Sequence, residues 1–397
     1  MLWSMGLIMM VGWLGGDLFA KIKLPRLLAY LLAGILVGPY GLNLIEDSLV
    51  NMAGDIRQFA LMIILIRAGL SMNFSDLAKV GRPAILMCFL PALCELLGVG
   101  LIAPLVLGMT YAESFLLGSV LAAVSPAVLV PRMVAMMDQG LGTRKAIPQM
   151  VLAAGTADDI LIFVLFAVFM QMNQGHGFSL ASIWMVPVTL VTGIGLGYLA
   201  GKMLLFVQKY YQFSQLNFMV ISLAVSMLLM GLEKMVSGFM PYSGVLAVMV
   251  AYLIVQKQFP NLSQKLSRTY QKVWSMAEIF LFAFLGVAVN ASLALQAGGP
   301  LLLVIVFGLL CRMVGVCLSV LKTPFSWSER FFIMGAYIPK ATVQASLGGL
   351  PLMAGLESGL SILIAATLSI LLTAPFGAFF IDYFGPRLLE KEDEAVT

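Results

Sequence analysis

The sequence predicts an all-α integral membrane protein, and three observations support this prediction. Of the 397 residues, 61% are hydrophobic and only 11% are charged, whereas soluble domains carry about 25% charged residues. The mean hydropathy is +1.01. Apolar runs of about 20 residues, the length that crosses a bilayer, follow one another along the chain. We therefore expect a multi-pass protein with about 13 transmembrane helices.

The expected spans divide into six, one and six. An odd number of crossings in between inverts the second set relative to the first, which is the architecture of inverted-repeat transporters. We assign residues 1–172 to the first repeat, 173–210 to a linker helix, 211–385 to the second, inverted repeat and 386–397 to a short cytoplasmic tail. The span centres lie near residues 12, 33, 64, 95, 126, 158, 193, 225, 249, 282, 310, 340 and 371.

The basic residues predict the orientation of the chain. The connections after odd-numbered spans, together with the tail, contain 18 of the 23 Lys and Arg residues, whereas the connections on the other side contain only Arg57 and Lys234. Cytoplasmic loops of membrane proteins carry an excess of Lys and Arg. We therefore expect the N-terminus outside and the C-terminus in the cytoplasm. The compact length favours a cell inner membrane.

Two expected spans are interrupted near their middle by proline. The breaks are Val124-Ser125-Pro126-Ala127 and Tyr337-Ile338-Pro339-Lys340-Ala341-Thr342, at corresponding positions of the two repeats. Proline removes a backbone donor and clashes with the preceding turn. One such proline alone favours an ordinary kink. Matched breaks in both halves instead predict two broken, crossing helices, supported by Pro126 and Pro339, whose ends contribute to an ion site.

Two adjacent carboxylates, Asp158 and Asp159, lie in the middle of an apolar run from Lys145 to Met172. A carboxylate within a bilayer costs about 2.5–3.5 kcal/mol on insertion scales, and neighbouring carboxylates repel each other. On a helix their side chains point about 100° apart. We expect them to bind Na+ or Li+ in competition with protons, with oxygen ligands from Thr156 and Ser125. The structural alternative is a pair satisfied by a buried arginine, with no role in transport.

Three further charges lie within expected spans. Glu95 is at the centre of the fourth span and Arg312 is near the centre of the eleventh, its repeat partner. We expect a buried ion pair between them, because an unpaired charge there is costly. The alternative is that Arg312 reaches the aspartates directly. Lys340 lies in the second break, where we expect it to neutralise the C-terminal end of a half-helix.

These motifs resemble the monovalent cation/proton antiporters and, among them, the sodium/proton antiporters of the NHA type. The resemblance covers nearly the whole chain. A weaker cue is Leu24-Pro25 leading to Gly34 and Gly38-Pro39. The most specific parts are Ala157-Asp158-Asp159, Ala123-Val124-Ser125-Pro126-Ala127-Val128, Ile338-Pro339-Lys340-Ala341-Thr342-Val343-Gln344-Ala345 and Arg67-Ala68-Gly69-Leu70.

The resemblance implies a homodimer, with a dimerisation domain and a mobile six-helix core that moves in an elevator-like way. It also implies that Asp159 is the main cation ligand and Asp158 its partner. The transported ions are then Na+ (or Li+) and H+, with no cofactor. We expect no nucleic-acid partner, because the basic residues are spread among the loops. We also expect no nucleotide-binding domain, because the tail is short.

The chain departs from many electrogenic relatives at two positions. It has Ser125-Pro126 where they often have Thr-Asp, and Arg312 where they have a lysine. A lysine can release its proton and so take part in proton counting, whereas arginine is effectively always charged. The resulting hypothesis is electroneutral exchange, with one proton per cation, although two aspartates are usually associated with two protons.

Three alternative functions remain open at this point. A potassium/proton antiporter of the same fold is the closest. A cation channel is disfavoured, because two broken, repeat-related helices with a titratable site indicate alternating access. An intramembrane protease, an enzyme, also uses two carboxylates. It needs them on different helices facing one water, whereas Asp158 and Asp159 are adjacent on one helix.

Overall fold

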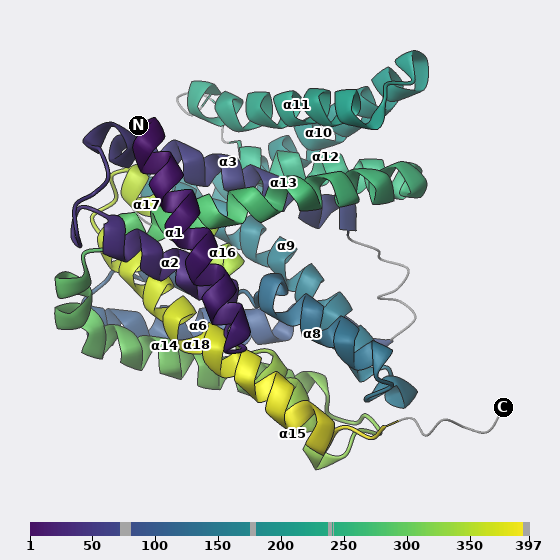
Figure 1. Cartoon of the computed structure of the whole chain (residues 1–397). Helices are drawn as coiled ribbons and strands as arrows, with labels where there is room; N and C mark the ends of the chain where they lie inside the picture. Colours follow the sequence, from purple (N-terminus) through teal and green to yellow (C-terminus); the bar gives the residue numbers. More distant parts are fainter. Residues whose placement is uncertain (72–80, 175–179, 237–239, 241, 392–397) are drawn as a thin grey trace.

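The structure is a computed structural model that describes residues 1–71, 81–174, 180–236, 240 and 242–391. Within these ranges the chain is helical, as predicted, and forms no β-strand (Figure 1). The only extended pairing among them is a single bridge between Leu141 and Lys391. The fold is therefore a bundle of α-helices.

The helices pack into two groups, seen above and below one another on the right of Figure 1. We call the first the scaffold group, and the second, which contains both broken helices, the crossing group. The scaffold group consists of α1 (Leu2–Lys21), α2 (Arg26–Val37), α3 (Asp47–Ser71), α10 (Leu180–Tyr211), α11 (Gln215–Val236), α12 (Gly244–Gln258) and α13 (Pro260–Val287). The crossing group consists of α5 (Arg82–Met87), α6 (Leu90–Leu107), α7 (Tyr111–Leu121), α8 (Pro126–Asp138), η1 (Thr143–Lys145), α9 (Ile147–Gln174), α14 (Ala291–Ser319), α15 (Trp327–Ala336), α16 (Thr342–Leu347), α17 (Leu350–Met353) and α18 (Gly359–Leu388).

The lengths and composition of these helices fit a multi-pass membrane protein. Three shorter apolar helices accompany the long ones, and the two proline breaks fall at residues 122–125 and 337–341, where the sequence places them. In the described part of the chain, eight helical stretches are long and apolar enough to cross a membrane: Leu2–Lys21, Asp47–Leu70, Arg82–Leu107, Tyr111–Asp138, Val188–Tyr211, Gln215–Glu233, Gly298–Ser319 and Gly359–Leu388.

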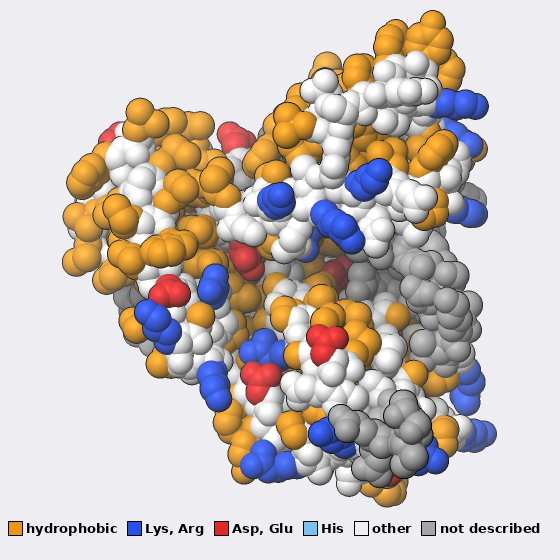
Figure 2. All heavy atoms as spheres, turned by 45° about the vertical axis from the view of Figure 1, so that its right-hand side comes forward, with side chains coloured by type: hydrophobic (Ala, Val, Ile, Leu, Met, Phe, Trp, Pro, Cys, Tyr) orange, Lys and Arg blue, Asp and Glu red, His pale blue; other side chains and the backbone are white. Residues whose placement is uncertain are grey.

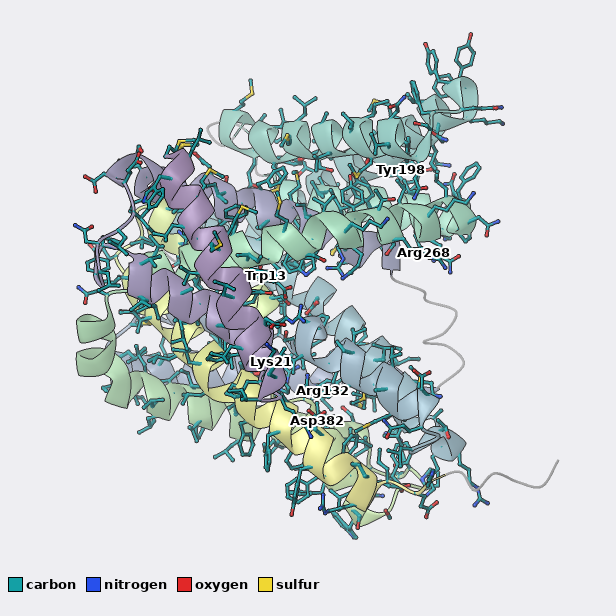
Figure 3. The ribbon with its side chains drawn as sticks, viewed as in Figure 1. Trp13, Lys21, Arg132, Tyr198, Arg268 and Asp382 are labelled. Carbon is teal, nitrogen blue, oxygen red and sulfur yellow. The ribbon has the colours of Figure 1, made fainter. Side chains whose placement is uncertain are left out.

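Ion pairs fasten the peripheral ends of the crossing group. Arg132 on α8 and Asp382 on α18 point toward one another in Figure 3, with Arg132 Nε 3.0 Å from Asp382 Oδ1. Lys145, at the end of η1, lies 2.9 Å from the buried Glu329 on α15. These contacts join one half of each broken helix, α8 and α15, to a neighbouring element.

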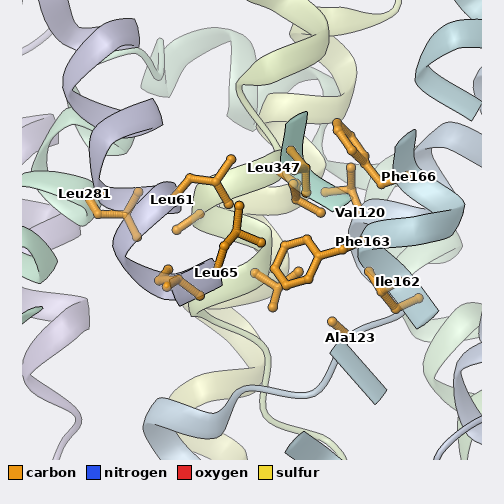
Figure 4. Close-up of a cluster of buried hydrophobic side chains, with 14 of the residues drawn as sticks. Leu61, Leu65, Val120, Ala123, Ile162, Phe163, Phe166, Leu281 and Leu347 are labelled. Atoms are coloured by element: carbon orange, nitrogen blue, oxygen red, sulfur yellow. The ribbon is translucent and has the colours of Figure 1, made fainter. Parts of the chain in front are cut away.

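An apolar layer lies where the two groups meet (Figure 4). Leu61 and Leu65 of α3 belong to the same buried cluster as Phe163 and Phe166 of α9 and Leu347 of α16. In a bilayer such contacts are stabilised mainly by close van der Waals packing, since the surrounding lipid is equally apolar. The layer excludes water from the middle of the interface.

A cavity of about 650 Å³ lies between the groups, near the start of α3 and the end of α9. Its lining includes Phe166 and Met170 of α9 and the carboxylates of Asp55 and Glu233. Figure 2, from another direction, shows the molecular surface hollowed between the groups, with acidic and basic side chains inside the hollow. Polar side chains thus lie toward the ends of the interface, and the apolar layer lies in its middle.

The start of α15 provides a test of local stability. Ser326 Oγ accepts from the Glu329 backbone N–H, and the Glu329 side chain accepts from the Ser326 N–H, which is a capping box. Replacing an N-cap serine by alanine costs about 1 kcal/mol. We expect Ser326→Ala to lower the unfolding temperature of the detergent-purified protein, and Ser326→Thr, which keeps the hydroxyl, to preserve it. Equal unfolding temperatures for all three proteins would contradict this.

Candidate ion-binding site

The two broken helices touch at their breaks. The backbone N–H of Ser125 donates to the carbonyl of Pro339 over 2.8 Å. Pro339 packs closely on α18, where a Cβ added to Gly377 would lie 2.3 Å from Pro339 Cγ. The crossing is thus held by a direct backbone hydrogen bond and by a glycine that leaves room for the proline ring.

The half-helix α7 ends at Leu121 and leaves its last carbonyls without helical partners, as every helix end does. Cationic and amide side chains from elsewhere in the crossing group donate hydrogen bonds to the carbonyls at this end of the helix. Lys340 Nζ donates to the Leu121 carbonyl over 2.5 Å, Arg312 Nη1 donates to the Ala122 carbonyl, and Gln344 Nε2 donates to the Ala123 carbonyl over 2.9 Å. Positive charge is favourable here because a helix C-terminus carries partial negative charge.

Arg312 on α14 joins the two acidic positions. Its Nη1 lies 3.1 Å from Glu95 Oε2 and its Nη2 lies 2.5 Å from Asp158 Oδ2. The pairing with Glu95 and the alternative pairing with an aspartate are both present in the structure. Arg312 Nε also donates to the Tyr337 carbonyl over 3.0 Å, at the end of the half-helix α15. One guanidinium thus contacts both breaks and two carboxylates.

Lys340 completes this network. Its Nζ lies 2.6 Å from Glu95 Oε1, so Glu95 pairs with two cations. The four side chains Glu95, Asp158, Arg312 and Lys340 are at most 1% exposed. Two negative and two positive charges therefore balance within one buried cluster, which is the condition for ions to be tolerated away from water.

Asp159 follows Asp158 directly and lies beside this network without a cation among the described residues. Its side chain is 2% exposed, its Oδ1 lacks a hydrogen-bond partner, and it forms no ion pair with any residue that the structure describes. Buried polar atoms are nearly always paired, so such atoms call for a ligand. Asp158 Oδ1, Ser125 Oγ and Gln344 Oε1 are likewise buried without a hydrogen-bond partner in the described part of the chain.

Apart from Asp159, the expected site residues fall into three sets. Arg312 gathers Glu95 and Asp158, and Lys340 joins them through Glu95. Ser125 lies at the crossing through its backbone bond to Pro339, and Pro126 is the first residue of α8. The side chain of Thr156 lies outside the described part of the structure.

Sequence reasoning missed three members of the network. Gln344 binds the end of α7, the aromatic ring of Tyr337 lies 5.4 Å from the Arg312 guanidinium, and Thr373 Oγ1 accepts from the Lys340 N–H over 2.9 Å. Gln344 and Tyr337 stand beside the second proline break, so polar residues flanking a break are the signal that could have found them. Thr373 gave no such signal.

The site is closed toward the 650 Å³ cavity. Phe163 and Phe166 follow Asp159 along α9 by one and two helical turns, and Phe166 lines that cavity. Phe163 is fully buried in the apolar layer of Figure 4. Within the described residues no group of three or more His, Cys, Asp or Glu side chains suits a metal ion.

Two proline-broken helices that cross at a buried carboxylate pair define a secondary transporter of an ion. The comparison with known proteins makes this specific. Residues 6–384 match the transmembrane sodium/hydrogen exchanger family, and the chain belongs to that family.

Individual relatives agree with this assignment. The chain is 32% identical over 402 residues to human sodium/hydrogen exchanger 9B2, covering 95% of this chain and 73% of the relative. It is 30% identical over 397 residues to human sodium/hydrogen exchanger 9B1, with 95% and 76% covered. The solved sodium proton antiporter MjNhaP1 from Methanocaldococcus jannaschii superposes with a TM-score of 0.81 at 22% identity, covering 98% of both chains, and so shares the fold.

The chain is therefore a membrane-embedded sodium/proton antiporter of the monovalent cation/proton antiporter superfamily. It is a transporter rather than an enzyme, which removes the intramembrane protease from the alternatives. The ions that such exchangers move are Na+ and H+.

The charge network predicts that Glu95 is a stabilising residue. In Glu95→Gln, Arg312 keeps one carboxylate and Lys340 keeps none. Removing one partner from a buried ion pair costs about 3–5 kcal/mol. We expect a clear fall in the unfolding temperature of the purified protein, and little change for Glu357→Gln, whose side chain is exposed. If both variants unfold at the temperature of the parent protein, the network does not stabilise the fold.

Proposed function

We propose that Asp159 is the group that carries either Na+ (or Li+) or a proton across the membrane, with Asp158 as its partner. The balance of charges supports this. Glu95 and Asp158 are compensated by Arg312 and Lys340, so Asp159 is the one acidic side chain of the cluster that lacks a cation among the described residues. A buried, uncompensated carboxylate is unstable, and one monovalent cation or one proton neutralises it.

The same balance explains why transport is exchange rather than leak. Moving the site past the apolar layer with a bare Asp159 carries a net charge through a region of low dielectric constant, which is costly. With Na+ or H+ bound the cluster is neutral, and the cost falls. Only loaded states therefore change their exposure readily, so a cation carried one way is matched by a proton carried the other way.

The stoichiometry follows from which groups can change their charge. Arg312 does not release a proton under physiological conditions, and Asp158 is held as its ion partner. Asp159 remains as the single exchanging site. We propose electroneutral exchange of one proton for one Na+ or Li+.

The architecture suits alternating access. We propose that the crossing group moves against the scaffold group, which provides the dimerisation surface of a homodimer. The contact between the groups includes the apolar side chains Leu61, Leu65, Phe163 and Leu347, and such a surface shifts without breaking ion pairs. We also propose thirteen spans in a six, one and six inverted arrangement, in a cell inner membrane, with the N-terminus outside and the C-terminus in the cytoplasm.

The first test removes the proposed carrier. In sealed proteoliposomes, Na+ or Li+ added to the parent protein should drive proton flux, and Asp159→Asn should reduce that flux to the level of protein-free liposomes, because the amide does not exchange a proton. Asp382→Asn, which removes a carboxylate from the peripheral pair with Arg132, is the matched control and should keep most of the flux. Full flux in Asp159→Asn would place the carrier elsewhere. Potassium-driven flux of equal size would contradict selectivity for Na+ and Li+.

The second test addresses the stoichiometry. Because one charge replaces another of the same sign, sodium-dependent proton flux should have the same initial rate whether or not the membrane potential is clamped at zero with potassium and valinomycin. A solid-supported membrane recording should show no sustained current. A rate that rises severalfold under the clamp, or a current that reverses with the ion gradients, would show electrogenic transport.

A further inference from the structure

Arg57 on α3 is a buried cation that the exchange mechanism does not use. It is 5% exposed, and its Nε and Nη1 atoms lack hydrogen-bond partners in the described part of the structure. Arginine is effectively always charged, so the group does not escape this situation by losing a proton. A buried, unpaired guanidinium is costly unless an acceptor from outside the chain fills its donors.

Arg57 reaches from the scaffold group to the crossing group. A Cβ added to Gly349 would lie 2.4 Å from Arg57 Nη1, so the guanidinium packs directly on that glycine. Gly349 stands between α16, which ends at Leu347, and α17, which begins at Leu350. Arg57 therefore lies next to the C-terminal end of α16, a half-helix of the second broken span. The crossing is at the other, N-terminal end of α16.

A second cavity, of about 340 Å³, lies beside Arg57 and shares Asp55 and Met353 with the lining of the 650 Å³ cavity. It has a mixed lining: Arg57 and Asp55 supply charge, and the exposed Asn51 supplies an amide. The remaining walls are Val50, Ala53, Gly54, Val287, Ala288 and Met353. The cavity thus combines one buried cation, one exposed carboxylate, one exposed amide and several apolar side chains.

Two groups within the chain are candidates to satisfy Arg57, and neither does. The C-terminal end of α16 attracts positive charge, but the α16 carbonyls accept no hydrogen bond from Nε or Nη1. Asp55 precedes Arg57 by two positions, about 200° around the helix, and no ion pair joins them. The donors of Arg57 are left for a ligand.

We propose that this cavity binds a small monovalent anion of the chloride class, held by the guanidinium of Arg57 and the amide of Asn51. The Asp55 carboxylate in the same lining is exposed and stays solvated, whereas the Arg57 guanidinium is buried with unpaired donors, so the buried charge is matched by one monovalent anion. The negative charge of Asp55 disfavours a multivalent anion. Because Arg57 belongs to the scaffold group and Met353, in the same cavity lining, to the crossing group, the anion lies between two surfaces that are in contact in this conformation. Binding therefore stabilises this arrangement of the two groups.

The test measures binding apart from sodium/proton exchange. The unfolding temperature of the protein in lipid-free detergent is followed as choline chloride replaces choline gluconate at constant ionic strength, so that no sodium is present. We expect chloride and bromide to raise it by at least roughly 2 °C. Arg57→Gln should abolish the rise. Gly349→Ala should reduce it, because the added methyl displaces the guanidinium.

Arg132→Gln is the matched control, because it removes a guanidinium whose partner is Asp382 and should leave the anion effect intact. If Arg57→Gln does not fold, bromide soaked into crystals of the unaltered protein should give anomalous density at Arg57. Three results would overturn the proposal: no anion effect in the parent protein, an undiminished effect in Arg57→Gln, or no bromide at Arg57. The exchange activity of Asp159→Asn tests the proposed function alone and does not affect the outcome of the anion-binding test.

Discussion

The contact between Arg312, Glu95 and Asp158 is the interaction on which the rest of the site depends. The guanidinium binds two carboxylates and the carbonyls of Ala122 and Tyr337, each just beyond the end of a half-helix. A planar group with five donors meets this demand, and a lysine, with its single nitrogen, reaches fewer partners at once. The two broken helices are therefore tied together by a cation that keeps its charge.

The ion pairs of this cluster distinguish the carboxylates that are paired with a cation from the one that is not. Lys340 and Arg312 neutralise Glu95 and Asp158 and fill the carbonyls at the end of α7. The neighbouring Asp159 is the only acidic side chain of the cluster that has no cationic partner among the described residues. The structural alternative of an aspartate satisfied by a buried arginine thus describes the surroundings of Asp158, whereas Asp159 has no such partner among the described residues. The two adjacent residues differ in their surroundings because the helix points their side chains in different directions.

Much of this was readable from the sequence, since it rests on local patterns. Hydropathy indicated the helices, and Pro126 and Pro339 located the breaks. The position of Asp158 and Asp159 in an apolar run predicts the ion site, which stays a prediction. The pairing of Glu95 with Lys340 was not predicted, because Lys340 lies in a helix break rather than in the span that is the repeat partner of the span containing Glu95. The alternatives for Arg312 stayed open for a related reason: sequence gives the depth of a side chain in the membrane but not which partners it reaches.

The central claim is that one carboxylate exchanges one proton for one cation. Its most direct test is to count the protons released when Na+ binds, by isothermal titration calorimetry of the purified protein in buffers that differ in ionisation enthalpy. At a pH where the cation-free site is protonated, the account predicts one proton released per sodium bound and no heat of binding in Asp159→Asn. Release of two protons would show that Asp158 or Lys340 also titrates, and release of none would separate the cation site from the proton site.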